Sequence, residues 1–154
     1  MSETELTLTN RFQRVGAISN AHAGRDFEQA VQRFLTGEGF EVKPCFPLPV
    51  GRQRVKSHRF DLGSADPPMV VECKSYTWTS GGNSPSAKLR SLNEAMLIFS
   101  VTPPAYRKML VMLRHLRGEV SLAQHYIRSQ GHLIPMGVEV WEFDDVTEEG
   151  SRLL

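Results

Sequence analysis

The chain has few of the residues and patterns that define several large classes of protein. Only two of its 154 residues are cysteines, Cys45 and Cys73, and their number and spacing suit neither a disulfide framework nor a zinc motif. We predict that both are reduced thiols on strands. No segment reaches the length of about 20 apolar residues that spans a bilayer, and the N-terminal residues contain no signal-peptide core. We therefore expect a cytoplasmic protein that does not act at a membrane.

The chain also has little net charge. Its formal net charge is +1 at pH 7, with 40% hydrophobic and 23% charged residues. This balance is that of a globular protein and excludes a disordered chain. The length predicts one domain, which we place at residues 19–154, after a polar lead over residues 1–18.

The most informative segment runs from Arg59 to Lys74 and reads RFDLGSADPPMVVECK. Asp61 is followed by a turn rich in glycine and proline, and then by a hydrophobic run that ends in Glu72, Cys73 and Lys74. In an extended strand Glu72 and Lys74 share one face, and Cys73 points to the other. Ionised groups at the ends of buried strands lose hydration unless they are paired or bound to a cation. Three charges at neighbouring strand ends therefore indicate a site.

Two carboxylates and a lysine suit the chemistry of phosphate esters. Mg²⁺ takes oxygen ligands, commonly one or two carboxylates, and leaves other positions to water and phosphate oxygens. We expect Mg²⁺ here, with Mn²⁺ as a substitute, to polarise a phosphodiester and acidify a bound water. Lys74 would orient that water or neutralise the developing charge.

These residues resemble the motif of the PD-(D/E)xK nuclease superfamily, in which an acid ends one strand and Glu-x-Lys follows on the next. The match consists of Asp61, ten intervening residues and Glu72-Cys73-Lys74, with Phe60 in place of the proline in the family's name. The resemblance implies that Asp61 and Glu72 bind the metal, that Lys74 is catalytic, and that the main-chain carbonyl of Cys73 is a further ligand.

The resemblance extends to a leading helix. The superfamily's core usually begins with a helix that carries a glutamate, and the apolar periodicity of residues 24–35 predicts such a helix here. Glu28 falls at the edge of its apolar stripe, where a carboxylate can lean over a sheet. We assign Glu28 as the fourth catalytic and metal-binding residue.

Periodicity and punctuation predict the remaining elements. We expect a strand over 40–50, strands ending at Asp61 and Lys74, a helix from Pro85, a strand over 107–113, a helix over 121–130 and a strand over 138–143. The order is α-β-β-β-α-β with an added αβ, which matches the core of the restriction-endonuclease-like fold: a mixed central sheet flanked by helices. The acids at positions 144, 145, 148 and 149 predict a solvated tail.

Positive charge is concentrated in two groups. One precedes Asp61 and comprises Arg52, Arg54, Lys56, His58 and Arg59, and the other flanks the 107–113 strand and comprises Arg107, Lys108, Arg114, His115 and Arg117. Phosphate contacts depend on local positive groups. We predict that Arg52, Arg54, Lys56 and Arg59 bind nucleic acid, with a solvated basic turn as the alternative.

The polar loop over 75–86 and the helix after it supply two further candidates. We predict that Trp78 contacts nucleic acid by stacking and that Lys88 reaches the substrate. The alternatives are that Tyr76 and Trp78 anchor the loop onto the core, and that Lys88 extends its ammonium into water.

Together these features predict a metal-dependent phosphodiesterase that cleaves nucleic acid, most simply a DNA endonuclease. Because one small domain has one such site, cutting both strands calls for a homodimer or two successive nicks. One alternative is a nuclease-fold module that binds nucleic acid or a protein partner without cleaving. Another is a structural domain in which Glu72 and Lys74 form a surface ion pair.

Overall fold

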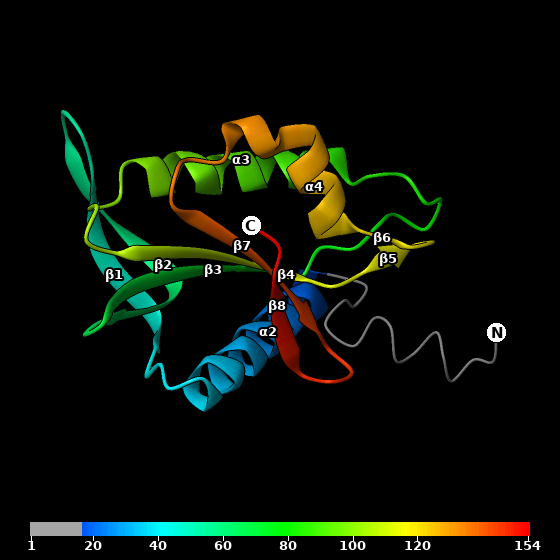
Figure 1. The fold of residues 1–154 in the computed structure, drawn as a ribbon, viewed down its shortest axis with the longest axis horizontal. Helices are drawn as coiled ribbons and strands as arrows, with labels where there is room; N and C mark the ends of the chain where they lie inside the picture. Colours follow the sequence, from blue (N-terminus) through cyan, green and yellow to red (C-terminus); the bar gives the residue numbers. More distant parts are fainter. Residues whose placement is uncertain (1–16) are drawn as a thin grey trace.

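The computed structural model describes residues 17–154, with side chains from Ala23 onward. A six-stranded mixed sheet carries α2 (Ala17–Gly37) on one face and α3 (Ser86–Ser100) and α4 (Leu122–Gln130) on the other (Figure 1). The order of elements agrees with the predicted α-β-β-β-α-β followed by αβ. The predicted lead over residues 1–18 lies outside the described residues, except for the first two residues of α2.

The sheet combines antiparallel and parallel pairs. Its strand order is β1-β2-β3-β4-β7-β8, formed by β1 (Lys43–Gly51), β2 (Val55–Ala65), β3 (Pro68–Lys74), β4 (Arg107–Leu113), β7 (Val138–Asp144) and β8 (Glu149–Arg152). Strands β3, β4 and β7 are parallel, and the other neighbours are antiparallel. Parallel neighbours need crossover connections, which α3 and α4 supply on the same face of the sheet. Short strands β5 (Leu116–Arg117) and β6 (Val120–Ser121) form a separate hairpin before α4. The 3₁₀ turn η1 (Gly131–Leu133) follows α4.

The sheet separates two hydrophobic clusters. The cluster under α3 and α4 includes Phe60, Val70, Leu110 and Val140, and the cluster under α2 includes Phe27, Leu62, Val71, Met109 and Phe143. Consecutive residues of β3 and β4 enter opposite clusters, so these strands are buried on both faces. This double burial explains why both strands are nearly continuous apolar runs in the sequence.

Strand β2 is distorted at Asp61. Residues two apart in a regular strand share a face, yet Phe60 packs under α3 and Leu62 packs under α2. Pairing with β1 is regular at Phe46–Phe60 and at Pro44–Leu62 but is interrupted between them. There Cys45 has a φ of 52°, in the left-handed region. The interruption lets β2 change the face that it buries and directs Asp61 towards the end of β3.

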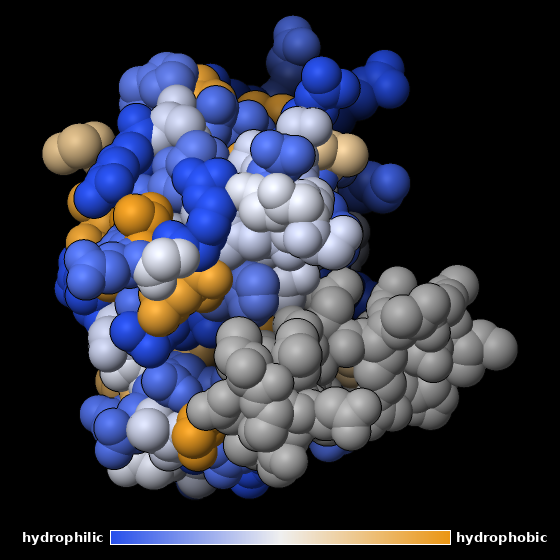
Figure 2. Space-filling model, turned by 90° about the vertical axis from the view of Figure 1, so that its right-hand side faces the viewer, coloured by the Kyte–Doolittle hydropathy of each residue, from blue (hydrophilic) through white to orange (hydrophobic). Residues whose placement is uncertain are grey.

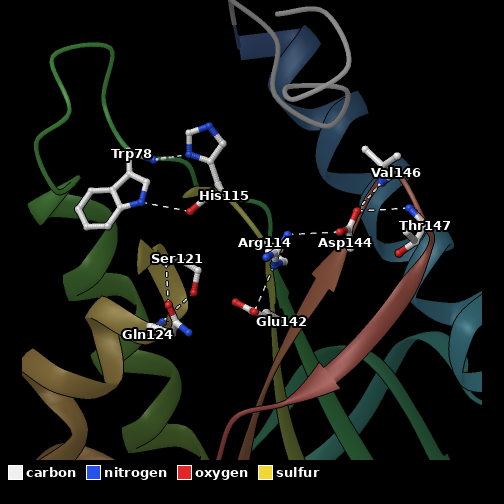
Figure 3. A network of polar contacts seen from close by, with 9 residues as sticks. All are labelled: Trp78, Arg114, His115, Ser121, Gln124, Glu142, Asp144, Val146 and Thr147. Atoms are coloured by element: carbon white, nitrogen blue, oxygen red, sulfur yellow. Dashed lines mark hydrogen bonds and ion pairs between the residues drawn. The ribbon is translucent and has the colours of Figure 1, made fainter. Parts of the chain in front are cut away.

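The prediction of a solvated C-terminal tail was wrong. The chain turns after β7, where the side chain of Asp144 accepts hydrogen bonds from the main-chain N–H groups of Val146 and Thr147 (Figure 3). It then returns as β8, which pairs with β7, and Asp145 is only 5% exposed. In β8, a Cβ added at Gly150 would lie 2.7 Å from the ring of Phe34 on α2, so the close packing of this strand requires a residue without a side chain.

Polar residues dominate the visible part of one end of the molecule. Figure 2 shows that hydrophobic atoms are present there only in small separate groups. Among residues 17–154, no helix combines the length and the apolar character needed to cross a membrane.

The three proline residues of β1 fit its place at the edge of the sheet, because an edge strand pairs on one side only and tolerates missing N–H groups better than a central strand.

Candidate active site

Three elements bring three acidic side chains together. Helix α2 supplies Glu28, the distorted part of β2 supplies Asp61, and β3 supplies Glu72. Asp61 lies within hydrogen-bonding reach of both glutamates, and its Oδ2 accepts a hydrogen bond of 2.8 Å from the main-chain N–H of Cys73. The main-chain N–H of Cys73 thus binds the Asp61 carboxylate, and Asp61 lies between the two glutamates.

The electrostatics of this cluster favour protonated glutamates. Burial, followed by the charge of Asp61, raises the pKa of Glu72 to about 8. The same two causes, in the same order, raise the pKa of Glu28 to about 7. Each glutamate is also stabilised in its protonated form by a hydrogen bond to Asp61. At neutral pH the described side chains therefore provide too little positive charge to keep all three acids ionised.

Lys74 is the cation of the cluster. Burial acts to lower its pKa, but the Tyr76 hydroxyl and the carboxyl groups of Glu72 and Asp61, in their ionised forms, raise it overall. Its ammonium lies 5.9 Å from the centre of the Tyr76 ring, and the Tyr76 hydroxyl is 2.6 Å from Ser91 Oγ on α3. Lys74 is therefore charged, half-buried and placed against a ring that α3 holds.

A cavity of about 170 Å³ opens beside Glu72 and Lys74, between the sheet and α3. Charged and polar side chains line it together with apolar ones, and the lining comprises His58, Glu72, Lys74, Ser91, Glu94, Ala95 and Ile98. The two motif residues thus face a space where a small group can bind. His58 Nε2 lies 3.0 Å from Glu72 Oε1, a contact that the sequence did not reveal, because His58 belonged to the group of basic residues before Asp61.

The Cys73 side chain points away from this cavity. It is buried in the cluster under α2, and burial raises the pKa of its thiol well above the ordinary value. The thiol is therefore protonated in the metal-free protein and lies in the cluster under α2, away from the cavity that Glu72 and Lys74 line. Only the main-chain carbonyl of Cys73 remains for the ligand role that the family resemblance implies.

The carboxyl groups do not form a ready-made metal cage. Among residues 17–154, no three His, Cys, Asp or Glu side chains are arranged as a set of metal ligands. Mg²⁺ commonly uses only one or two carboxylates together with water and substrate oxygens. Asp61 and Glu72 provide that number of carboxylates on adjacent strands, so the donor set fits a hard divalent cation.

The predicted nucleic-acid-binding residues of the first basic group lie on the hairpin of β1 and β2. Arg52, Arg54, Lys56 and Arg59 are all exposed, and none forms an ion pair with a residue that the structure describes. At about 3.3 Å per residue, Lys56 lies about 16 Å along β2 from Asp61. The hairpin thus carries positive charge that the residues described by the structure do not pair, and β2 leads from it to the acidic cluster.

The other two predicted contacts have different outcomes. Lys88 lies near the site, with its ammonium 5.4 Å from the centre of the same Tyr76 ring that Lys74 contacts. Trp78 does not fit its predicted stacking role, because it is only 5% exposed and its indole N–H donates to the main-chain carbonyl of His115 (Figure 3). The alternative, that Trp78 anchors the loop, agrees with this geometry.

The second basic group has mainly structural partners. Arg107 is hydrogen-bonded to buried Glu139, and Arg114 lies 3.5 Å from both Glu142 and Asp144 (Figure 3). Arg117 stacks on Trp78, with its guanidinium carbon 3.9 Å from the ring centre, and donates to the carbonyl of Gly82. These contacts leave the first basic group as the better candidate for binding phosphates.

Comparison with protein-family models, curated proteins and solved structures finds no significant match to this chain.

Proposed function

We propose that the protein is a metal-dependent phosphodiesterase that cleaves nucleic acid, and that duplex DNA is its substrate. The observation that carries the proposal is the convergence of Glu28, Asp61 and Glu72 with Lys74 beside a small cavity that Glu72 and Lys74 line. Three clustered acids destabilise a fold by mutual repulsion and desolvation. An arrangement with that cost is expected where a cation binds.

The donor set supports Mg²⁺ or Mn²⁺ as the cation. Asp61 and Glu72 would hold it, with the main-chain carbonyl of Cys73 and Glu28 as further oxygen donors. When bound, such a cation polarises a phosphoryl group and lowers the pKa of bound water. Binding would also replace the protons that the two glutamates hold in its absence.

The roles of the remaining residues follow from their positions. Lys74 shares a face of β3 with Glu72 and borders the same cavity, so its ammonium would orient the attacking water or neutralise charge on the phosphoryl oxygens. Lys88, whose ammonium also lies near the Tyr76 ring, would contact a neighbouring phosphate. The exposed arginines and lysine of the β1–β2 hairpin would hold the backbone farther along the duplex.

Cleavage of supercoiled plasmid tests this proposal. The purified protein is incubated with Mg²⁺, Mn²⁺ or EDTA, beside the variants Lys74→Ala and Lys108→Ala. Lys108 is a matched control because it is a half-buried lysine on the adjacent strand β4, in register with Val70 rather than with the motif. We expect metal-dependent nicking or linearisation that Lys74→Ala reduces at least 100-fold, since loss of one transition-state-stabilising group typically costs about 10² to 10³ in rate. Lys108→Ala should retain activity.

The form of the cleaved plasmid indicates how many sites act together, and the activity of the variants tests the assigned site. Linear product formed without a nicked intermediate would indicate two sites acting together, as in a homodimer, and accumulation of nicked circles would indicate one site acting alone. Activity that survives in Lys74→Ala would refute the assigned site. Metal-independent binding of DNA without cleavage would instead favour the non-catalytic module.

A further inference from the structure

His58 makes a side-chain contact with the proposed metal ligand Glu72, and both residues line the cavity. Its Nε2 lies 3.0 Å from Glu72 Oε1, at a distance typical of a hydrogen bond. The Glu72 side chain is 10% exposed and that of His58 is 29% exposed, so the contact is largely shielded from water. The contact engages Oε1 of a residue that borders the cavity.

The His58 ring is itself held in place. It packs edge-on against Phe60, with ring centres 4.6 Å apart and an interplanar angle of 80°. Phe60 in turn stacks on Phe99 of α3, with ring centres 6.0 Å apart. The orientation of the imidazole is therefore fixed by the core under α3, to which Phe60 and Phe99 belong.

We propose that His58 is a positioning residue that holds the Glu72 carboxylate in the orientation that binds the metal. This inference rests on the proposed metal-dependent function and adds a residue to its site. Carboxylates that bind metals are commonly oriented by hydrogen bonds from outer partners, and loss of such a partner typically lowers metal affinity about 10- to 100-fold. A glutamate side chain has three rotatable bonds, so a fixed partner reduces the entropy lost when the metal binds.

The competing explanation is that His58 serves only to fill space against Phe60. Two substitutions separate the possibilities, because each keeps one of its contacts. His58→Phe retains an aromatic ring against Phe60 but has no nitrogen to bond to Glu72. His58→Gln loses the ring but retains a side-chain amide that can donate a hydrogen bond to the carboxylate. His132→Ala is a control, since His132 is an exposed histidine in η1, outside the cavity.

The experiment is a calorimetric titration of each full-length protein with Mn²⁺ alone at one fixed pH, with thermal unfolding in EDTA as a check of folding. The metal concentration that gives half-maximal plasmid cleavage is measured in parallel. We expect His58→Phe to weaken Mn²⁺ binding at least 10-fold and to raise the metal concentration for half-maximal cleavage by a similar factor. The cleavage rate at saturating metal should change less. His58→Gln should recover most of the affinity, and His132→Ala should match the wild-type protein.

Each outcome decides the inference. Wild-type Mn²⁺ affinity in a folded His58→Phe protein would overturn it while leaving the proposed function intact. Weaker binding by His58→Gln than by His58→Phe would assign the role to the ring and overturn it as well. A wild-type protein that neither binds Mn²⁺ nor cleaves DNA would overturn the proposed function, and this inference with it.

Discussion

At the scale of single residues, the proton on Glu72 connects stability with the proposed chemistry. Burial and the charge of Asp61 raise the pKa of Glu72 to about 8, whereas an exposed glutamate has a pKa near 4.5. Between these values the folded protein holds a proton that the unfolded chain releases. Stability from this group is thus fully present at low pH and is lost as the pH rises through about 8.

We therefore predict that Glu72→Gln stabilises the metal-free protein at high pH. The amide keeps the shape and cannot ionise, so the variant should gain on the order of 2 kcal/mol in the free energy of unfolding at pH 8.5 relative to wild type, and little or nothing at pH 5. Urea unfolding in EDTA at the two pH values measures this difference. A gain that is equal at both pH values would show that ionisation of Glu72 is not its source.

Glu139 provides a matched control for this prediction. It is a second buried glutamate, on β7, but hydrogen bonds and charge from Arg107 outweigh its burial and lower its pKa. A lowered carboxyl pKa contributes stability that is present near neutral pH and is lost as the pH falls. Glu139→Gln should therefore destabilise the protein at pH 7, the opposite sign to Glu72→Gln.

The sequence predicted part of the arrangement that the structure shows and missed the rest for a physical reason. Glu72 and Lys74 could be singled out because they follow the apolar run of β3, but the prediction that a strand ends at Asp61 was wrong, since β2 continues to Ala65. The contact between His58 and Glu72 joins β2 to the end of β3 and has no local sequence signal. Trp78 was predicted wrongly because burial of a loop aromatic depends on His115 and Arg117, which are far away in the sequence.

At the scale of elements, the sequence predicted helices and strands that residues within or next to the element stabilise, and it missed an element that depends on tertiary contacts. Helix α4 covers Leu122–Gln130, in agreement with the predicted helix over 121–130. The Ser121 hydroxyl accepts from the Gln124 N–H in a capping box, and Gly131 is the C-cap residue. Strand β8, with the sequence EGSR, was missed because it has no apolar alternation. It forms because β7 offers an edge and because Gly150 fits against Phe34, and both causes are tertiary.

The β1–β2 hairpin yields a prediction about nucleic-acid binding. Arg52 and Arg54 are exposed beside the hairpin turn, so each should neutralise about one phosphate without reading sequence. For duplex DNA in EDTA, we expect Arg52→Ala and Arg54→Ala each to reduce the slope of log affinity against log salt by about 1. Fluorescence anisotropy over a salt series measures the slopes.

The control for the hairpin is Arg128→Ala. Arg128 is an equally exposed arginine in the last turn of α4, on a different element. Its removal makes the same change in net charge and should leave the slope unchanged. If all three variants lowered the slope equally, general charge rather than the hairpin would account for binding.

At the scale of the whole molecule, the site joins two halves of the structure. Glu28 comes from the helix on one face of the sheet, and the Glu72–Lys74 cavity is closed by α3 on the other. Asp61 bridges them because β2 changes face at that position. A cation bound there would interact with elements from both hydrophobic clusters, so its binding should stabilise the fold as a whole.

We predict that Mg²⁺ or Mn²⁺ raises the unfolding temperature of the wild-type protein. A ligand at 100 times its dissociation constant stabilises the folded state by about 2.7 kcal/mol, and for a domain of this size each kcal/mol corresponds to about 2–4 °C. We therefore expect a rise of about 5–10 °C by differential scanning calorimetry, larger at pH 8 than at pH 6, because the ligands must lose protons to bind. The rise should be reversed by EDTA, absent with NaCl at equal ionic strength, and largely lost in Glu72→Gln. An ion pair between Glu72 and Lys74 with no metal function predicts no such rise, so an unchanged unfolding temperature at saturating Mn²⁺ would favour a structural role for the acidic cluster.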